Sequence, residues 1–219
     1  MREAMRQDGL AAMSPATAST GPEQRVSPRF TLLMRAAKLV GEHGEYMCIV
    51  RDASDSGVNI RLFHPLPDAD TLMLEFPNGD RHPLELVWQD SERAGLRFAE
   101  TADIARLLEC PSQFARRPIR VNLDLAADLL TGSTASPARL LDLSQQGAKL
   151  ICDFRHALDQ RVRLSARGLP EVNAKIRWRR DNAYGLVFED TFQFGDLAQI
   201  VAALQAGPKP QDGTPAPRR

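Results

Sequence analysis

Polar and apolar residues alternate along most of the chain, a pattern that is typical of strands with one buried face. In residues 119–127 (IRVNLDLAA), Ile, Val or Leu fills every second position up to residue 125. The turn signal PNGD at 77–80 separates two such stretches and predicts a hairpin. Further strands are predicted at 57–63, 70–76, 81–89, 94–100, 147–154, 160–166, 172–180 and 184–190.

Helical periodicity occurs in two places, each after a group of predicted strands. Residues 195–207 (GDLAQIVAALQAG) place Leu197, Val201 and Leu204 on one face of a helix, and residues 102–110 (ADIARLLEC) have a similar pattern. Several short antiparallel strands followed by a helix predict a closed or nearly closed barrel with the helix over one mouth.

The chain repeats itself at an offset of 90 residues. The hexapeptide D-x-S-x-x-G begins at Asp52 and again at Asp142, and the same offset relates Trp88 to Trp178. A G-L-x-F segment follows each tryptophan. Strand alternation places both tryptophans at inward or half-buried positions, so we expect them to pack in the barrel cores.

This repeat predicts a tandem duplication of one small domain with a disordered segment at each end. The expected boundaries are an N-terminal arm at 1–22, a first barrel with its helix at 23–113, a second barrel with its helix at 114–206, and a Pro-rich tail at 207–219.

Composition narrows the classes of function. The 219 residues carry a formal net charge of zero, which gives no general attraction to nucleic acid or to an anionic membrane. No stretch is apolar for long enough to predict membrane insertion. Three scattered cysteines indicate reduced thiols in a cytoplasmic protein, and no nucleophile–base or metal-ligand pattern predicts an enzyme.

A pair of arginines spaced R-x-x-x-R precedes each hexapeptide, at Arg25 and Arg29 in the first copy and at Arg116 and Arg120 in the second. Alone, the hexapeptide is most simply a turn, in which Asp and Ser bond to local N–H groups and Gly adopts a positive φ. An arginine fork, however, holds phosphate oxygens or the O6 and N7 acceptors of guanine, and a carboxylate complements the guanine N–H donors. The combination describes a receptor for a guanine nucleotide.

The segments RVSPR…DASDSG and RRPIR…DLSQQG, each followed by a W…GLxF strand, resemble the PilZ domain, the bacterial receptor family for cyclic di-GMP. The resemblance covers roughly residues 23–204 and implies an all-β fold of two tandem six-stranded antiparallel barrels, each followed by a short α-helix. It implies a flexible arginine segment that folds over the ligand. The implied ligand-binding residues are Arg25, Arg29, Asp52, Ser54 and Gly57 in the first copy and Arg116, Arg120, Asp142, Ser144 and Gly147 in the second.

Departures from the family pattern refine this expectation. Gln24 and Ala115 stand where family members often have an additional arginine, which favours one ligand molecule per site over a stacked pair. Asp55 adds a negative charge to the first motif, whereas the second copy has the additional cation Arg117. The second copy is therefore expected to bind at least as tightly as the first.

The expected function is a cytoplasmic, non-catalytic sensor of cyclic di-GMP that uses no other cofactor. Ligand binding is expected to order the R-x-x-x-R segments and to change the geometry between the barrels, with the output passing to a downstream protein partner. The alternative is a PilZ-like adaptor that has lost nucleotide binding and acts through protein–protein contacts in motility or exopolysaccharide control. A nucleic-acid-binding barrel is disfavoured by the neutral charge and the 6% aromatic content.

Overall fold

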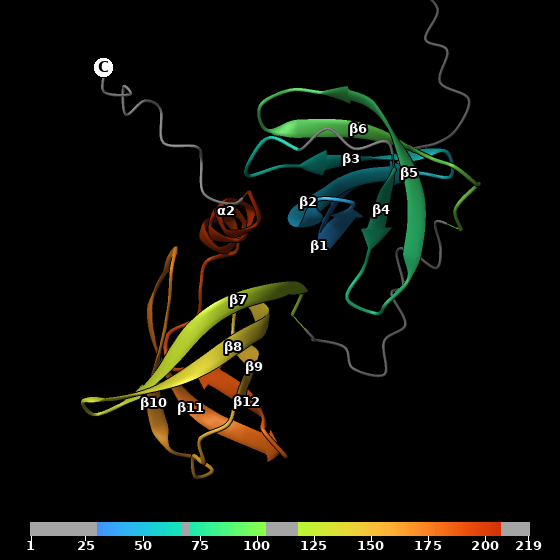
Figure 1. Cartoon of the computed structure of the whole chain (residues 1–219). Coiled ribbons are helices and arrows are strands. Elements are labelled where there is room, and N and C mark those ends of the chain that lie inside the picture. The colour runs from blue at the N-terminus through green and yellow to red at the C-terminus, as the bar shows by residue number, and fades with distance from the viewer. Residues whose placement is uncertain (1–29, 67–70, 104–117, 207–219) are drawn as a thin grey trace, which may run out of the picture.

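The computed structural model describes residues 30–66, 71–103 and 118–206, which form two closed barrels of six strands each (Figure 1). Barrel one consists of β1 (Phe30–Gly41), β2 (Gly44–Ser54), β3 (Gly57–Arg61), β4 (Leu72–Glu75), β5 (Arg81–Gln89) and β6 (Arg93–Phe98). Barrel two consists of β7 (Arg120–Thr131), β8 (Thr134–Ser144), β9 (Gly147–Cys152), β10 (Arg161–Ala166), β11 (Leu169–Arg180) and β12 (Ala183–Phe188), followed by the helix α2 (Phe194–Gln205). No helix in these ranges is both long and apolar enough to cross a membrane.

Both barrels have the same strand order, so the predicted duplication and the all-β fold are confirmed. Barrel one runs β1-β2-β3-β6-β5-β4 and barrel two runs β7-β8-β9-β12-β11-β10, with antiparallel neighbours throughout. Pairing of β1 with β4 and of β7 with β10 closes the two rings and leaves no free sheet edge. The predicted hairpin at 77–80 joins β4 to β5, with Gly79 at a φ of 89°.

Each barrel encloses its own core of inward-facing aliphatic side chains, as the period-two alternation predicts. Burying one such side chain contributes roughly 1.5–3 kcal/mol, so these cores are the main source of stability. The largest fully buried aliphatic side chains are Leu39, Met47, Ile60, Leu62, Leu74, Leu129, Leu140, Leu143, Leu150, Leu164 and Ile176.

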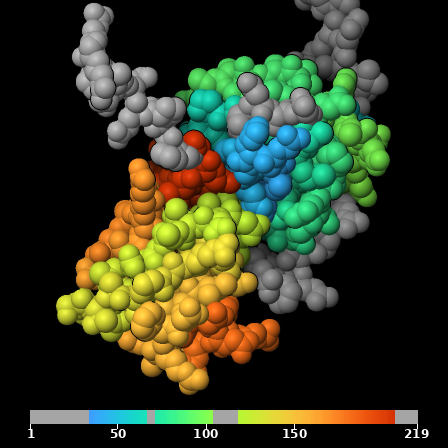
Figure 2. All heavy atoms as spheres, viewed as in Figure 1, coloured from blue at the N-terminus to red at the C-terminus, as the bar shows by residue number. Residues whose placement is uncertain are grey.

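The helix α2 lies between the two barrels (Figures 1 and 2). Leu197 and Val201 pack into the core of barrel two, whereas Ala202 packs against the core of barrel one. Near the start of α2, the ring of Phe194 meets Phe63 of barrel one edge-to-face, with 5.6 Å between the centroids. The predicted amphipathic helix is thus confirmed, but it packs against both barrels. Most of the helix predicted at 102–110 lies outside the described residues.

Barrel one also contributes directly to the second core. Met47 of β2 is fully buried and belongs to the core cluster of barrel two. At the other end of α2, the Gln205 side chain pairs with the backbone of Glu45: the Glu45 N–H donates to Gln205 Oε1, and Gln205 Nε2 donates to the Glu45 carbonyl, both at 2.6 Å. These contacts join the two barrels in the arrangement of this structure.

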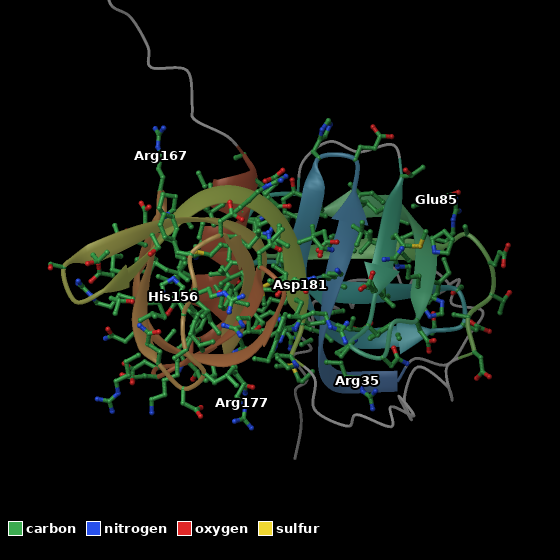
Figure 3. All side chains as sticks on the ribbon, turned by 60° about the horizontal axis from the view of Figure 1, so that its bottom comes forward. Arg35, Glu85, His156, Arg167, Arg177 and Asp181 are labelled. Carbon is green, nitrogen blue, oxygen red and sulfur yellow. The ribbon has the colours of Figure 1, made fainter. Side chains whose placement is uncertain are left out.

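A buried histidine lies between β9 and β10 of barrel two. His156 is 6% exposed and lies within the outline of this barrel in Figure 3. Its backbone N–H donates to the Tyr184 hydroxyl at 3.4 Å, and that hydroxyl donates to the Phe154 carbonyl at 2.9 Å. Burial lowers the pKa of His156 because poorly hydrated surroundings disfavour the imidazolium.

We expect the protein to lose stability as the pH falls below about 6.5, the ordinary histidine value. The pKa of His156 is lower in the folded chain, so between its folded and unfolded values the unfolded chain binds more protons. Stability is therefore unaffected above the unfolded pKa and falls as the pH drops toward the folded one. Burial lowers the pKa of His64 as well, so the wild type minus His156→Gln difference isolates His156.

Urea unfolding of the wild type and of His156→Gln between pH 5 and pH 8 measures this effect. The variant should lose part of the wild-type pH dependence in that window. If both proteins show the same slope of unfolding free energy against pH, the buried neutral imidazole is not its source.

Candidate functional site

The second D-x-S-x-x-G motif lies in a row of residues that crosses the outside of barrel two. Asp142 of β8 stands opposite Lys149 of β9, and Lys149 stands opposite Gly185 of β12. Gly185 in turn pairs with Trp178 of β11, while Asn122 of β7 stands on the other side of Asp142. We call these five residues row two: Asn122, Asp142, Lys149, Gly185 and Trp178. Four strand pairings therefore bring together residues that lie up to 63 positions apart, from 122 to 185.

Barrel one has the corresponding row at the same strand positions. Row one consists of Trp88, Gly95, Asn59, Asp52 and Thr31, paired in that order. The tryptophan, glycine and aspartate are the same in both rows. The middle position differs in charge, because row one has the neutral Asn59 where row two has Lys149.

β-bulges turn the functional side chains of row two to the outside of the barrel. In β11, Arg177 is an extra residue between two paired positions, and its side chain points away from the barrel (Figure 3). Beyond this bulge Trp178 faces outward, although Ile176, two residues earlier, is fully buried. Similarly, β8 has an irregular register between Leu140 and Asp142. Bulges next to binding sites commonly redirect side chains in this way.

The expectation that both tryptophans pack in the barrel cores is wrong. Trp88 is 44% exposed and Trp178 is 42% exposed. Each indole lies against the glycine of its row, where a Cβ atom on Gly95 or Gly185 would overlap the indole nitrogen. Glycine is therefore required at this position, and the exposed part of each indole is left available for a planar ligand.

An arginine from the predicted R-x-x-x-R segment meets the aspartate of row two. Arg120 begins β7, and its Nη1 donates to Asp142 Oδ1 at 2.6 Å. The side chain of Arg120 is 51% exposed and that of Asp142 is 15% exposed. The fold therefore brings together two residues of the second copy that the sequence assigns to the same ligand, Arg120 and Asp142, and their direct contact was not predicted. Arg25, Arg29 and Arg116 lie outside the described residues.

The serines and glycines of both motifs hold the turns that follow the aspartates. Ser144 Oγ donates to the Gly147 carbonyl at 3.0 Å, and Ser54 Oγ donates to the Gly57 carbonyl at 3.4 Å. Neither glycine has a positive φ. Each is required for a different reason, because a Cβ atom there would overlap a backbone carbonyl oxygen of the next strand, that of Leu96 or Leu186.

Each row borders a cleft, and the two clefts differ in size and in lining. The cleft at row one has a volume of about 230 Å³, and its lining among the described residues comes from barrel one alone, including Asp52, Ser54, Asn59, Trp88 and Arg97. The cleft at row two has a volume of about 590 Å³. Its lining combines Arg120, Asn122, Asp142, Lys149 and Trp178 of barrel two with Lys38, Glu75, Phe76, Pro77 and Gly79 of barrel one.

This arrangement suits a planar, anionic ligand. Arg120 and Lys149 offer cationic donors for phosphate, and Asp142 offers a carboxylate that accepts from N–H groups. The exposed indole of Trp178 offers a stacking surface. Within the described ranges, no three His, Cys, Asp or Glu side chains are grouped so as to hold a metal ion.

Sequence reasoning missed the indoles, Lys149 and Asn59 as parts of the site. The tryptophans and the glycines beneath them were visible as landmarks of the repeat, because both recur at the same offset as the motif. Two copies that keep a large aromatic residue on a surface indicate a shared role there. The middle position of the row gave no such signal, since it differs between the copies.

The sequence model of the PilZ domain family matches the chain twice, at residues 23–110 and 113–206. No curated protein matches the sequence. Among solved structures, PlzA of Borreliella burgdorferi in complex with c-di-GMP shares 13% identity over 78% of this chain and 87% of its own, with a TM-score of 0.32. The Bacillus subtilis inhibitor of motility MotI/DgrA shares 12% identity over 78% and 94%, with a TM-score of 0.33. YcgR of Escherichia coli in complex with c-di-GMP shares 12% identity over 79% and 84%, with a TM-score of 0.30.

Proposed function

The chain belongs to the PilZ domain family, and on that premise we propose that it is a non-catalytic receptor for cyclic di-GMP with one site on each barrel. The observation that carries this proposal is row two, where the Arg120–Asp142 pair stands beside Lys149 and an exposed indole at a cleft of about 590 Å³. A guanine-bearing diester has the complementary groups: N–H donors, a planar base and two phosphate charges.

In the proposed complex, Asp142 accepts hydrogen bonds from the N1–H and N2–H₂ groups of guanine. Arg120 and Arg116 donate to phosphate oxygens or to the O6 and N7 acceptors of the base. The base stacks on Trp178. Ser144 and Gly147 act through the turn, which their hydrogen bond closes and which holds Asp142 in place.

The first site follows the same plan with Arg25, Arg29, Asp52, Ser54 and Gly57. One cyclic di-GMP molecule occupies each site, because Gln24 and Ala115 stand where a stacked pair of ligands would use a further arginine. The proposed units are barrel one with its helix at 23–113 and barrel two with its helix at 114–206, between an arm at 1–22 and a tail at 207–219.

Signal output in this proposal comes from the segment that leads into β7. Ligand binding orders the R-x-x-x-R segment at 116–120 and changes the angle between the barrels, and a downstream protein partner in the cytoplasm reads that change. The ligand contacts must exceed the cost of ordering, which is roughly 1–2 kcal/mol for each residue that becomes fixed.

Two single-tryptophan variants test each site separately. The chain has two tryptophans, one in each row, so Trp88→Phe leaves Trp178 as the reporter of row two and Trp178→Phe leaves Trp88 as the reporter of row one. Cyclic di-GMP should change the fluorescence of both variants, and GTP at the same concentration should not. Row two should respond at an equal or lower ligand concentration, because it has Lys149 where row one has Asn59.

Isothermal titration of the wild type provides the stoichiometry, expected to be two ligands per chain. A response of row one at clearly lower concentration than row two would refute the ranking of the sites. Absence of both heat and fluorescence change at saturating ligand would refute the receptor proposal, and would favour the adaptor hypothesis.

A further inference from the structure

We infer that barrel one is part of the second site: Lys38 positions the Arg120 main chain, and the hairpin between β4 and β5 forms the wall opposite row two. This inference rests on the proposed function and adds to it, because it assigns ligand-site roles to a barrel that lies outside the second motif. The start of β7 and the β4–β5 turn lie close together in Figure 1, and both line the same cleft.

Lys38 is a buried cation at the junction of the barrels. It is 4% exposed, and its Nζ lies 2.9 Å from Glu45 Oε2 and 3.2 Å from Glu75 Oε1. The same Nζ donates to the Arg120 carbonyl at 3.2 Å. An ammonium group has three donors, and these three acceptors use all of them. Lys38 therefore links two carboxylates of barrel one to the residue that pairs with Asp142.

Glu45 fixes the same strand two residues further on. Its Oε2 accepts from the Asn122 N–H at 2.7 Å, and its Oε1 accepts from Asn122 Nδ2 at 2.8 Å. The backbone at positions 120 and 122 is thus held by barrel one on both sides of residue 121. Because hydrogen bonds with charged groups are comparatively strong and directional, this contact sets where the Arg120 guanidinium emerges.

The hairpin provides the opposite wall of the cleft. Phe76 is buried in barrel one, while Pro77 and Gly79 are exposed at the cleft. Glu75 is anchored there by Lys38 on one side and by Arg81 on the other, at 2.7 Å from Arg81 Nη2. A ligand that stacks on Trp178 and reaches Arg120 would therefore lie between row two and the β4–β5 hairpin of barrel one.

Among the residues that the structure describes, the first site has no counterpart of this wall, because those that line its cleft all belong to barrel one. The chain positions that correspond to Lys38 and Glu45, 90 residues later, are Asp128 and Ala135, so the repeat supplies neither the cation nor the acceptor. The two sites consequently share one motif but differ in the surroundings that a ligand meets.

A charge placed on the β4–β5 hairpin tests whether the hairpin borders the bound ligand, and it leaves the contacts of Lys38 with Glu45 and Glu75 in place. Pro77→Glu and the matched control Pro77→Gln are made in the Trp88→Phe background, and cyclic di-GMP is titrated while Trp178 fluorescence is read. Pro77→Glu should weaken binding about three- to tenfold relative to Pro77→Gln, because a carboxylate in the lining of the cleft repels the ligand phosphates. Added salt should reduce the difference. The same pair in the Trp178→Phe background should leave the first site unchanged.

Lys38→Met tests the positioning role. Second-site affinity should fall about tenfold or more, because Arg120 loses a charge-assisted contact to its main chain, while first-site affinity stays unchanged. The matched control Arg81→Met removes the other cation bound to Glu75, on the exposed side, and should leave both affinities unchanged. Thermal unfolding of each variant separates loss of fold from loss of ligand.

The outcomes distinguish this inference from the receptor proposal on which it rests. If the Trp88→Phe protein binds cyclic di-GMP but Pro77→Glu, Pro77→Gln and a folded Lys38→Met all titrate like it, barrel one has no part in the second site. If Lys38→Met does not fold, equal binding by the two Pro77 variants alone overturns the inference. If the wild type binds no cyclic di-GMP, both proposals fail together.

Discussion

Replacing Asp142 with asparagine is expected to raise the Kd of the second site for cyclic di-GMP by about 30-fold or more, since hydrogen bonds to a charged group contribute roughly 1.5–3 kcal/mol each. Asparagine keeps the size of the side chain, but its amide NH₂ would face the N–H donors of guanine. The substitution also weakens the anchor of Arg120, whose Nη1 lies 2.6 Å from the carboxylate. The loss of the guanine acceptor and the weaker hold on Arg120 both reduce the affinity for the same ligand.

The measurement is a titration followed by Trp178 fluorescence in the Trp88→Phe background. Asp128→Asn is the matched control, because Asp128 is an exposed aspartate on β7, away from row two, and removes the same charge from the same barrel. Its affinity should stay within twofold of the parent protein. An Asp142→Asn protein that also binds within twofold of the parent would rule out a guanine contact at this aspartate.

Replacing Gly147 with alanine is expected to lower the free energy of unfolding by about 1–3 kcal/mol, the usual cost of forcing an extra carbon into a packed interior. The new Cβ would overlap the Leu186 carbonyl oxygen. That oxygen belongs to the backbone of β12, which is paired on both sides within a closed ring, so it has little freedom to move. Separation of β9 from β12 would also disturb Lys149, two residues further along β9.

Urea denaturation at neutral pH measures the loss. Gly132→Asn is the control: Gly132 has a φ of 58°, a conformation that asparagine tolerates, and a Cβ there meets no atom within 4 Å. Its unfolding free energy should change by only a few tenths of a kcal/mol. If Gly147→Ala is as stable as Gly132→Asn, close approach of the strands is not the reason for this glycine.

The repeat made much of this molecule predictable from the sequence. The offset of 90 residues between Asp52 and Asp142 showed that the chain contains one fold twice. The alternation of apolar residues identified nine of the twelve described strands and missed β1, β2 and β8. The recurrence of R-x-x-x-R before D-x-S-x-x-G singled out Arg120 and Asp142 as members of one site, although their direct contact was not predicted. These features are local, or they recur in both copies, and a single sequence displays both kinds of signal.

The parts that could not be predicted depend on bulges and on contacts between the copies. Alternation carried through Ile176 predicts an inward Trp178, but the extra residue Arg177 reverses the side on which the indole lies. Likewise, no pattern in the sequence connects Lys38 to Arg120, because these residues occupy different positions in their copies. A repeat shows which positions are equivalent, and it carries no information about how one copy packs on the other.

Met47 belongs to the core cluster of the barrel that follows its own, and Ala202 of α2 packs against the core of the barrel that precedes it. Each copy therefore supplies residues that pack against the core of the other copy, so the two repeats are not structurally independent. Separating the two barrels would leave a space in the core cluster of barrel two where Met47 packs. It would also expose the apolar surface of barrel one against which Ala202 packs. We therefore expect variation at Met47 to be constrained by the core cluster of barrel two, which includes Val121, 74 positions later in the chain.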